Sequence, residues 1–501
     1  MVTHRSRSTT DSDTEKENGS SASPQKVSKE NSTDDSIADP EGEPDSGIEL
    51  KPLVHKETDT EEYWSNDDED EDEFGRPHYE SDDEEGPTSN RRSSGGHHHH
   101  GISTGAHAGA TSGVGTASNS QVAVNIFISF IGAGLLGQPY AFRISGWLVG
   151  SLAVCAVSIA NVYAMMLLLK TRKKLESMDG HKKGSIKGYG DIGRLVAGER
   201  GENLVNTCLV ISQCGFSIAY IIFIAGNVTH AFPSIDRAWI CFGCIPLLAL
   251  LVQAKDMKSL SPFSLMADVA ILLGLGAVLF QDFEYYEYHH EVIKAATNFR
   301  GLLYVASVTI YSMEGVNLVL PLETSCADRK AFPGLLMKVV GGITTLMVAF
   351  GCAGYIAFGP HTDAPITLNL PEGIWSKFVK LSLCLALYLT YPVMMYPVNH
   401  VMEDAFETFQ RFSVATRTFM VFLTTVIAYA IPSFGDFLGL VGSSICMVLG
   451  FILPCYFHLQ THDRSELSFT EFYLDWMIMV LGGIMGVLGT YFSFIDLFTD
   501  D

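Results

Sequence analysis

One acidic side chain, Glu314, lies in the middle of an apolar stretch. It stands about fifteen residues into a run long enough to cross a bilayer. Carboxyl groups inside a membrane are costly and are functional candidates by default. Desolvation disfavours the charged form of this carboxyl, whereas free amides at a helix end favour it. Glu314 is therefore a candidate proton carrier; the alternative is a structural carboxylate that caps such amides, and the two roles can coexist.

The first apolar run carries residues that interrupt a helix. Three glycines and a proline fall within eight residues, namely Gly132, Gly134, Gly137 and Pro139. Glycine permits unusual backbone angles, and proline lacks a backbone donor. Unpaired backbone groups are costly in lipid, so a break here must face protein or a water-filled cavity. A glycine face for close helix packing is the alternative.

The run that contains Glu314 repeats this pattern. Gly315 precedes Pro321 by six residues, and Gly134 precedes Pro139 by five. Matching breaks in the first and sixth runs, which cross in opposite directions, indicate an inverted five-plus-five repeat. Half-helix N-termini attract a carboxylate. The predicted binding residues are Gly132, Ala133, Gly134, Tyr311, Ser312 and Gly315, with Glu314 as the proton-coupling candidate.

Polar residues in two other runs are weaker candidates for the same cavity. Gln213 and Tyr220 are spaced by seven on an otherwise apolar run, so one helix face could line a cavity. Hydrogen bonding between helices is an equal rival. Tyr388 and Thr390 could complete a cation site near the first break, although tyrosines at such positions also simply pack.

The elements that position these residues are apolar runs of membrane-spanning length, about 20 residues each. We therefore predict an all-α polytopic membrane protein with eleven transmembrane helices over 122–496. The runs are 122–142, 146–169, 203–232, 237–253, 261–280, 299–321, 334–358, 374–397, 414–433, 435–458 and 473–496.

An acidic tail precedes these runs. The 501-residue chain has a net charge of −23, and residues 1–100 hold 28 acidic but only 10 basic side chains. This composition predicts disorder over 1–121, with the tail free to bind cytosolic partners. The run His97–His100 could bind metal, but a low-complexity linker is the simpler interpretation. With no basic face, nucleic acid is a poor partner.

Loop charges predict the orientation of the chain. With the tail cytoplasmic, the cytoplasmic connections and helix ends carry 17 Lys and Arg, against 6 on the other side. This bias follows the positive-inside rule. The ten cysteines lie almost entirely in apolar runs, so no disulfide framework is expected. We expect no metal or cofactor, and the missing catalytic triad and P-loop argue against an enzyme and against ATP-driven transport.

Several segments resemble the amino acid/auxin permease family, in its vacuolar and proton-coupled amino acid transporter branches. They are NIFISFIGAGLLGQPYAFRISGW, YGDIGRLVAG, ISQCGFSIAYIIFIAGN and IYSMEGVNLVLPLE, and the resemblance covers about 122–496. It implies a LeuT-like fold of eleven spans and movement of amino acids linked to protons or sodium. It implies nothing about the tail.

These observations together predict a secondary active transporter of small neutral amino acids, coupled to protons. The expected location is a vacuolar, lysosomal or vesicular membrane, with the lipid bilayer, the amino acid and protons as partners. Two alternatives stay open: an amino-acid-sensing membrane receptor on the same fold, and a sodium-coupled transporter of the plasma membrane.

Overall fold

The computed structural model describes residues 115–178, 186–254, 257–288, 292–405 and 407–498. Most of the predicted tail, including His97–His100, lies outside these residues. The described elements are helices, and one isolated β-bridge joins Ala117 to Cys326. The α-helices are α1 (Asn119–Phe130), α2 (Ala133–Ser145), α3 (Trp147–Ser177), α4 (Tyr189–Ala231), α5 (Arg237–Gly243), α6 (Ile245–Leu251), α7 (Met257–Tyr288), α8 (Phe299–Ser312), α9 (Val316–Ser325), α10 (Phe332–Phe358), α11 (Ile374–Ala405), α12 (Glu407–Arg411), α13 (Ser413–Ala430), α14 (Phe434–Val441), α15 (Leu453–Thr461) and α16 (Phe469–Phe498).

Shorter elements complete the helical segments. Two 3₁₀ turns, Gly359–His361 and Ile366–Asn369, follow α10. Two π-helical turns, Gly442–Cys446 and Val448–Ile452, connect α14 to α15. Helices α14 and α15 therefore form one continuous apolar segment, Phe434–Thr461, with a wider winding at its centre.

The predicted all-helical membrane protein is confirmed. Within the described ranges, nine helical segments are long and apolar enough to cross a membrane. The pair α1 and α2, bent by 55° at a short break, makes a tenth. The two predicted breaks are present at glycines, at Gly132 between α1 and α2 and at Gly315 between α8 and α9, whereas Pro139 and Pro321 lie inside α2 and α9.

The predicted run 237–253 differs from the others. It forms the two short helices α5 and α6, which together span Arg237–Leu251. Pro246 lies in the first turn of α6 and removes a backbone donor at the junction. At 1.5 Å per residue this segment is roughly 22 Å long, less than the roughly 30 Å of a bilayer's hydrocarbon core.

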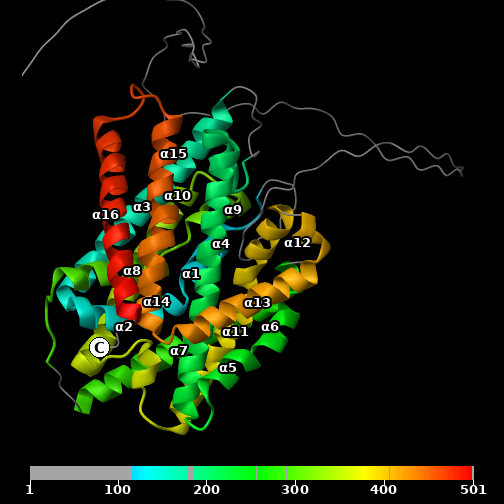
Figure 1. The fold of residues 1–501 in the computed structure, drawn as a ribbon. Helices are drawn as coiled ribbons and strands as arrows, with labels where there is room; N and C mark the ends of the chain where they lie inside the picture. The colour runs from blue at the N-terminus through cyan, green and yellow to red at the C-terminus, as the bar shows by residue number, and fades with distance from the viewer. Residues whose placement is uncertain (1–114, 179–185, 255–256, 289–291, 406, 499–501) are drawn as a thin grey trace, which may run out of the picture. The chain divides into compact units, whose positions relative to one another are not determined.

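Burial separates the central helices from the peripheral ones. In the most apolar stretches of α4 and of the α8–α9 segment, 83% of residues are buried, whereas in α16 only 17% are. Figure 1 shows α16 at one edge of the helices, beside α15. The central position of α4 and α8–α9 places their polar residues inside protein, and the exposed apolar side chains of α16 suit contact with lipid.

The start of the described chain is attached to the end of α9. The Ala117 amide donates to the Ser325 carbonyl at 3.0 Å, and the Ala327 amide donates to the Ala117 carbonyl at 3.0 Å. A Cβ on Gly115 would lie 2.6 Å from the Thr324 carbonyl oxygen. Only glycine allows this close approach, so residues 115–118 belong to the folded body.

Candidate functional site

A cavity of about 110 Å³ lies where the two helix breaks meet. Its walls come from α1, α2, α4, α8, α9, α11 and the two breaks. The residues that line it are Ser129, Phe130, Gly132, Ala133, Gly134, Gln213, Phe216, Tyr220, Tyr311, Ser312, Glu314, Asn317, Leu318, Val393, Met394 and Pro397.

The first break leaves a helix N-terminus open to this cavity. Ile131 and Gly132 have extended backbone conformations, so α1 ends and α2 begins in a new direction. Gly132 is the N-cap of α2, and no side chain caps the first turn. The first amides of a helix have no partner within the helix, and they carry its partial positive charge.

The second break leaves another helix N-terminus beside the first. Helix α8 ends at Ser312, and α9 begins after Gly315. Gly315 is the N-cap residue of α9, and it makes no side-chain hydrogen bond to the first turn. Helix α3 holds the interrupted segment in place. Asn161 Nδ2 donates to the Met313 carbonyl at 2.8 Å, and Ser158 Oγ lies 3.0 Å from Met313 Sδ.

Glycine allows the two breaks to pack directly together. A Cβ on Gly134 would lie 2.9 Å from Ser312 Cβ and 3.0 Å from Ser312 Cα. A Cβ on Gly315 would lie 2.5 Å from Cζ of the Phe130 ring. Any larger residue at either position must push α2 and α8, or α1 and α9, apart.

Glu314 lies on the cavity wall, and one of its carboxyl oxygens has no hydrogen-bond partner in the part of the chain that the structure describes. Its Oε1 atom is buried, and the described residues supply no hydrogen bond to it. The Oδ1 atom of Asn317, on the same wall, is likewise buried and unpaired among the described residues. The N-cap residues of α2 and α9, Gly132 and Gly315, have no side chains with which to cap the first amides of these helices. Buried polar atoms of this kind need a partner, and a ligand in the cavity can supply one.

Most of the predicted site residues meet at this cavity. Eight line it: Gly132, Ala133, Gly134, Gln213, Tyr220, Tyr311, Ser312 and Glu314. Gly315 does not; it shapes the site through its backbone beneath Phe130. The Tyr311 ring packs edge-on against Phe216, with ring centroids 4.7 Å apart.

In α11 the structure differs from the prediction. Tyr388 donates its hydroxyl to the Cys244 carbonyl at 3.0 Å, and Thr390 donates to the Ala386 carbonyl of its own helix at 2.9 Å. Neither lines this cavity, which α11 meets instead through the apolar residues Val393, Met394 and Pro397.

Glu323, at the end of α9, belongs to a separate buried ion pair. It pairs with Arg172 of α3, which also contacts Glu176 at 3.1 Å. Both members of the Arg172–Glu323 pair are almost fully buried. Each neutralises the other, so this pair ties α9 to α3 and leaves the cavity's one carboxyl group, Glu314, unaffected.

Comparison with known proteins agrees with the predicted resemblance. The chain is 36% identical over 390 residues to amino acid transporter AVT3A of Arabidopsis thaliana, covering 76% of this chain and 90% of that protein. It is 27% identical over 407 residues to vacuolar amino acid transporter 3 of Schizosaccharomyces pombe, covering 76% and 58%.

A solved structure also aligns with the chain. Mhp1, a nucleobase-cation-symport-1 family transporter, matches with a TM-score of 0.46 and 13% identity, over 76% of this chain and 93% of Mhp1. Residues 115–495 match the family described as transmembrane amino acid transporter protein. By that match and by its identity to AVT3A, the chain belongs to this family of membrane transporters, which are not enzymes.

Proposed function

We propose that this protein is a secondary active transporter that moves small neutral amino acids, driven by protons, across the membrane of an acidic compartment such as a vacuole, lysosome or vesicle. The observation that carries the proposal is the pair of uncapped helix N-termini, of α2 and α9, at one buried cavity. The amides around Gly132, Ala133 and Gly134 are the proposed site for the substrate carboxylate.

The opposite helix ends suit the other charged group of an amino acid. Helices α1 and α8 end at the same breaks, at Phe130 and Ser312. The last carbonyls of a helix carry its partial negative charge, so they favour a cation. Two positive and two negative helix ends around one cavity match the carboxylate and the ammonium group of a free amino acid.

The size and lining of the cavity support a small neutral side chain. A volume of 110 Å³ is small beside the roughly 300–1,000 Å³ of pockets that hold drug-sized ligands. Phe216, Leu318 and Met394 provide apolar walls. Glu314 is the one charged residue among those that line the cavity. A charged side chain on the substrate would therefore find no charged partner in the cavity except this carboxyl group.

Glu314 is the proposed proton carrier. Its buried Oε1 lacks a partner among the described residues, and a carboxyl in that position is less costly when protonated. A vacuolar location is supported by the names of the Schizosaccharomyces pombe and Saccharomyces cerevisiae relatives, each called vacuolar amino acid transporter 3. The loop charges support a cytoplasmic N-terminus.

Uptake into liposomes containing the purified protein tests this function. A screen of radiolabelled amino acids with an imposed pH gradient and no sodium should show accumulation of small neutral amino acids. Accumulation only with a sodium gradient would support the sodium-coupled alternative. Saturable binding without turnover would instead identify a sensor.

A further prediction concerns the tail. Deleting residues 1–114 should leave uptake in liposomes within about two-fold of the full chain, because low-hydrophobicity acidic segments do not contribute to a packed membrane core. In cells the deletion should change location or regulation. A matched deletion that also removes 115–118 should lower stability, since Ala117 is hydrogen-bonded to Ser325 and Ala327. Loss of purified activity in the shorter deletion would show that the tail is part of the transport machinery.

A further inference from the structure

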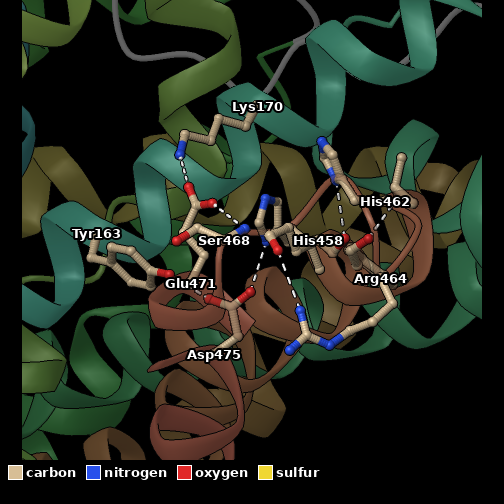
Figure 2. A network of polar contacts seen from close by, with 11 residues as sticks. Tyr163, Lys170, His458, His462, Arg464, Ser468, Glu471 and Asp475 are labelled. Atoms are coloured by element: carbon tan, nitrogen blue, oxygen red, sulfur yellow. Dashed lines mark hydrogen bonds and ion pairs between the residues drawn. The ribbon is translucent and has the colours of Figure 1, made fainter. Parts of the chain in front are cut away.

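A second cluster of titratable groups is buried away from the cavity, between α3, α15 and α16. Tyr163 donates its hydroxyl to Asp475 Oδ1 at 2.6 Å, and His458 Nδ1 lies 2.7 Å from Asp475 Oδ2. The side chains of His458 and Asp475 are 2% and 0% exposed. Figure 2 shows Tyr163 and His458 converging on the Asp475 carboxylate.

The cations near this cluster already have other partners. Lys170 pairs with Glu471 at 2.6 Å, and Lys174 pairs with Glu466. Arg464 donates to the Leu467 carbonyl and lies over the ring of Phe472. Among the described residues, no Lys or Arg forms an ion pair with Asp475. The titratable and charged groups around the cluster are Lys170 and Lys174 from α3, Tyr189 from α4, Cys455 from α15, His462, Arg464 and Glu466 from the segment after α15, and Glu471 from α16.

Two of these neighbours, which lie outside the membrane-spanning segments, do not change protonation state near neutral pH. The hydrogen bond from Lys174 holds the pKa of Glu466 below its usual range. Burial lowers the pKa of His462, whose ring lies 4.4 Å from that of His458. His462 is therefore neutral near neutral pH, and it does not compensate the charge of Asp475 there.

The geometry leaves the cluster with two charge states that differ by one proton. The short contact between His458 Nδ1 and Asp475 Oδ2 requires one hydrogen between them. With a neutral imidazole, that hydrogen leaves the cluster with a net charge of −1. A proton on the second ring nitrogen of His458 makes the net charge zero. Burying a net charge is costly, so the zero-charge state is favoured as the surrounding pH falls.

We propose that Tyr163, Asp475 and His458 form a proton-binding site, separate from the cavity, whose occupancy sets the pH at which the transport cycle runs. The inference rests on the proposed transport function, because its readout is the transport rate. The ligand is a proton, and it is gained or lost at His458 without making or breaking any other covalent bond.

Helix α3 connects this site to the substrate cavity. Asn161 and Ser158 of α3 contact Met313, the residue next to Glu314. Tyr163, two residues beyond Asn161 on the same helix, donates to Asp475. In the zero-charge state an ion pair joins His458 of α15 to Asp475 of α16, and the hydroxyl of Tyr163 joins α3 to α16 through the same carboxylate. In the −1 state the same interface carries an uncompensated charge that water would stabilise. Protonation therefore favours the packed arrangement of α3 against α15 and α16.

Two pairs of titratable side chains give protons a route to the cluster. His462 is the C-cap residue that follows α15, and its ring lies 4.4 Å from that of His458. Glu471 and Asp475 are four residues apart on α16, so they lie one above the other on that helix. The outer members are accessible: Glu471 is 31% exposed through its side chain, and its partner Lys170 is 51% exposed. The cluster is thus loaded from the side of the membrane on which Lys170 and Glu466 lie, the predicted cytoplasmic side.

Two variants and one matched control test the site in the full-length protein in liposomes. Exchange of radiolabelled amino acid is measured with equal pH on both sides, between about pH 5 and about pH 8, the range in which histidine changes charge. Tyr163→Phe removes only the hydroxyl that stabilises the carboxylate. It should move the midpoint of the pH profile upward by about one pH unit, because a hydrogen bond to a charged group is lost. His458→Asn keeps a donor for Asp475 but holds no extra proton, so it should abolish this step in the profile.

The control is a second histidine–aspartate pair at the same separation, in which the histidine Nδ1 has no hydrogen-bond partner among the described residues. His400 Nδ1 lies 2.7 Å from Asp404 Oδ2, but these side chains are 34% and 53% exposed. His400→Asn should therefore keep the wild-type midpoint. If both Tyr163→Phe and His458→Asn scale the rate without moving the midpoint, the cluster is structural and the inference is wrong. Should His458→Asn fail to fold, Tyr163→Phe still decides, since it loses a single oxygen atom.

The same liposomes separate this inference from the proposed function. A proton site that changes only the transport rate does not change the final accumulation ratio. Both cluster variants should therefore reach the wild-type ratio under a pH gradient, but at a different rate. A wild-type protein that exchanges amino acids but ignores the gradient contradicts the proposed proton coupling. Normal wild-type accumulation with unchanged variant midpoints contradicts the second proton site alone.

Discussion

Gly134→Val should abolish amino acid uptake, lowering the initial rate at least ten-fold. The structure places Gly134 against the other break, where an added Cβ would lie 2.9 Å from Ser312 Cβ and 3.0 Å from Ser312 Cα. Valine adds two further methyl groups, so α2 must move away from α8. That movement displaces the amides of α2 from their position at the cavity, and catalytic or binding geometry tolerates little displacement. Uptake into liposomes measures the rate.

Two other glycines provide controls for this variant. A Cβ on Gly341, within α10, would meet nothing within 4 Å, so Gly341→Val should transport normally. A Cβ on Gly132 would meet only the Tyr220 hydroxyl, at 3.9 Å. Gly132→Ala should therefore fold normally, reduce the cavity by one methyl group and weaken uptake of the larger substrates first. Melting in detergent checks that each protein is folded, and normal uptake by folded Gly134→Val would move the site away from the first break.

The helices could be located from sequence because the bilayer imposes a simple rule on length and polarity. Runs of about 20 apolar residues must be helical in lipid, where backbone groups have no water to bond. The ends of the helices were harder to predict. Helix α4 begins at Tyr189, whereas the predicted run began at 203, because the intervening residues include Asp191, Arg194 and Glu202. A charged extension beyond the membrane carries no hydropathy signal.

The breaks could also be predicted, since glycine and proline act on their own backbone. Gly198 is a local case: its φ of +66° kinks α4, a conformation that favours glycine. The wall supplied by α11 could not be predicted in the same way. Whether Tyr388 or Met394 faces the cavity depends on how α11 is rotated against its neighbours, here through the Tyr388 bond to Cys244. Such rotation follows from long-range packing, which a single sequence does not encode in its periodicity.

The cluster around Asp475 illustrates the same limit. Tyr163 is 312 residues from Asp475 in the sequence, although His458 and Asp475 lie on consecutive helices. Each of the three alone resembles an ordinary polar residue. The weak signal was the spacing of four residues between His458 and His462 and between Glu471 and Asp475. Only the packing of α3 against α15 and α16 brings the two pairs and the tyrosine together.

Glu314→Gln should retain exchange of amino acids but lose their accumulation against a gradient. Glutamine has nearly the same size as glutamate and keeps an oxygen and a donor at the cavity wall, so substrate binding should survive. It cannot gain or lose a proton. A pH difference of one unit coupled to one proton can support about ten-fold accumulation, since about 1.4 kcal/mol corresponds to a factor of ten. The accumulation ratio of Glu314→Gln should therefore fall to about one, whatever the gradient.

The measurement compares two assays on the same liposomes. Exchange at equal pH reports binding and the return of the loaded carrier, while net uptake under an imposed pH difference reports coupling. Gln213→Glu is an informative partner, because it adds a carboxyl to the same cavity from α4 while Glu314 stays in place. If Glu314→Gln keeps the wild-type dependence of net uptake on the gradient, Glu314 is structural and protons are carried elsewhere or not at all.

Coupling is expected at Glu314 because its carboxyl group favours different protonation states when it is buried and when it is exposed to water. In this structure its buried Oε1 finds no donor among the described residues, so the ionised form is costly there. Open to water, the same carboxyl ionises readily. A substrate that presents its ammonium group to an ionised Glu314 would pair with it, and a protonated Glu314 would let the empty carrier close without a buried charge. These two conditions couple the movement of the substrate to the movement of the proton. In Glu314→Gln the amide cannot titrate, so the substrate would equilibrate across the membrane without coupling.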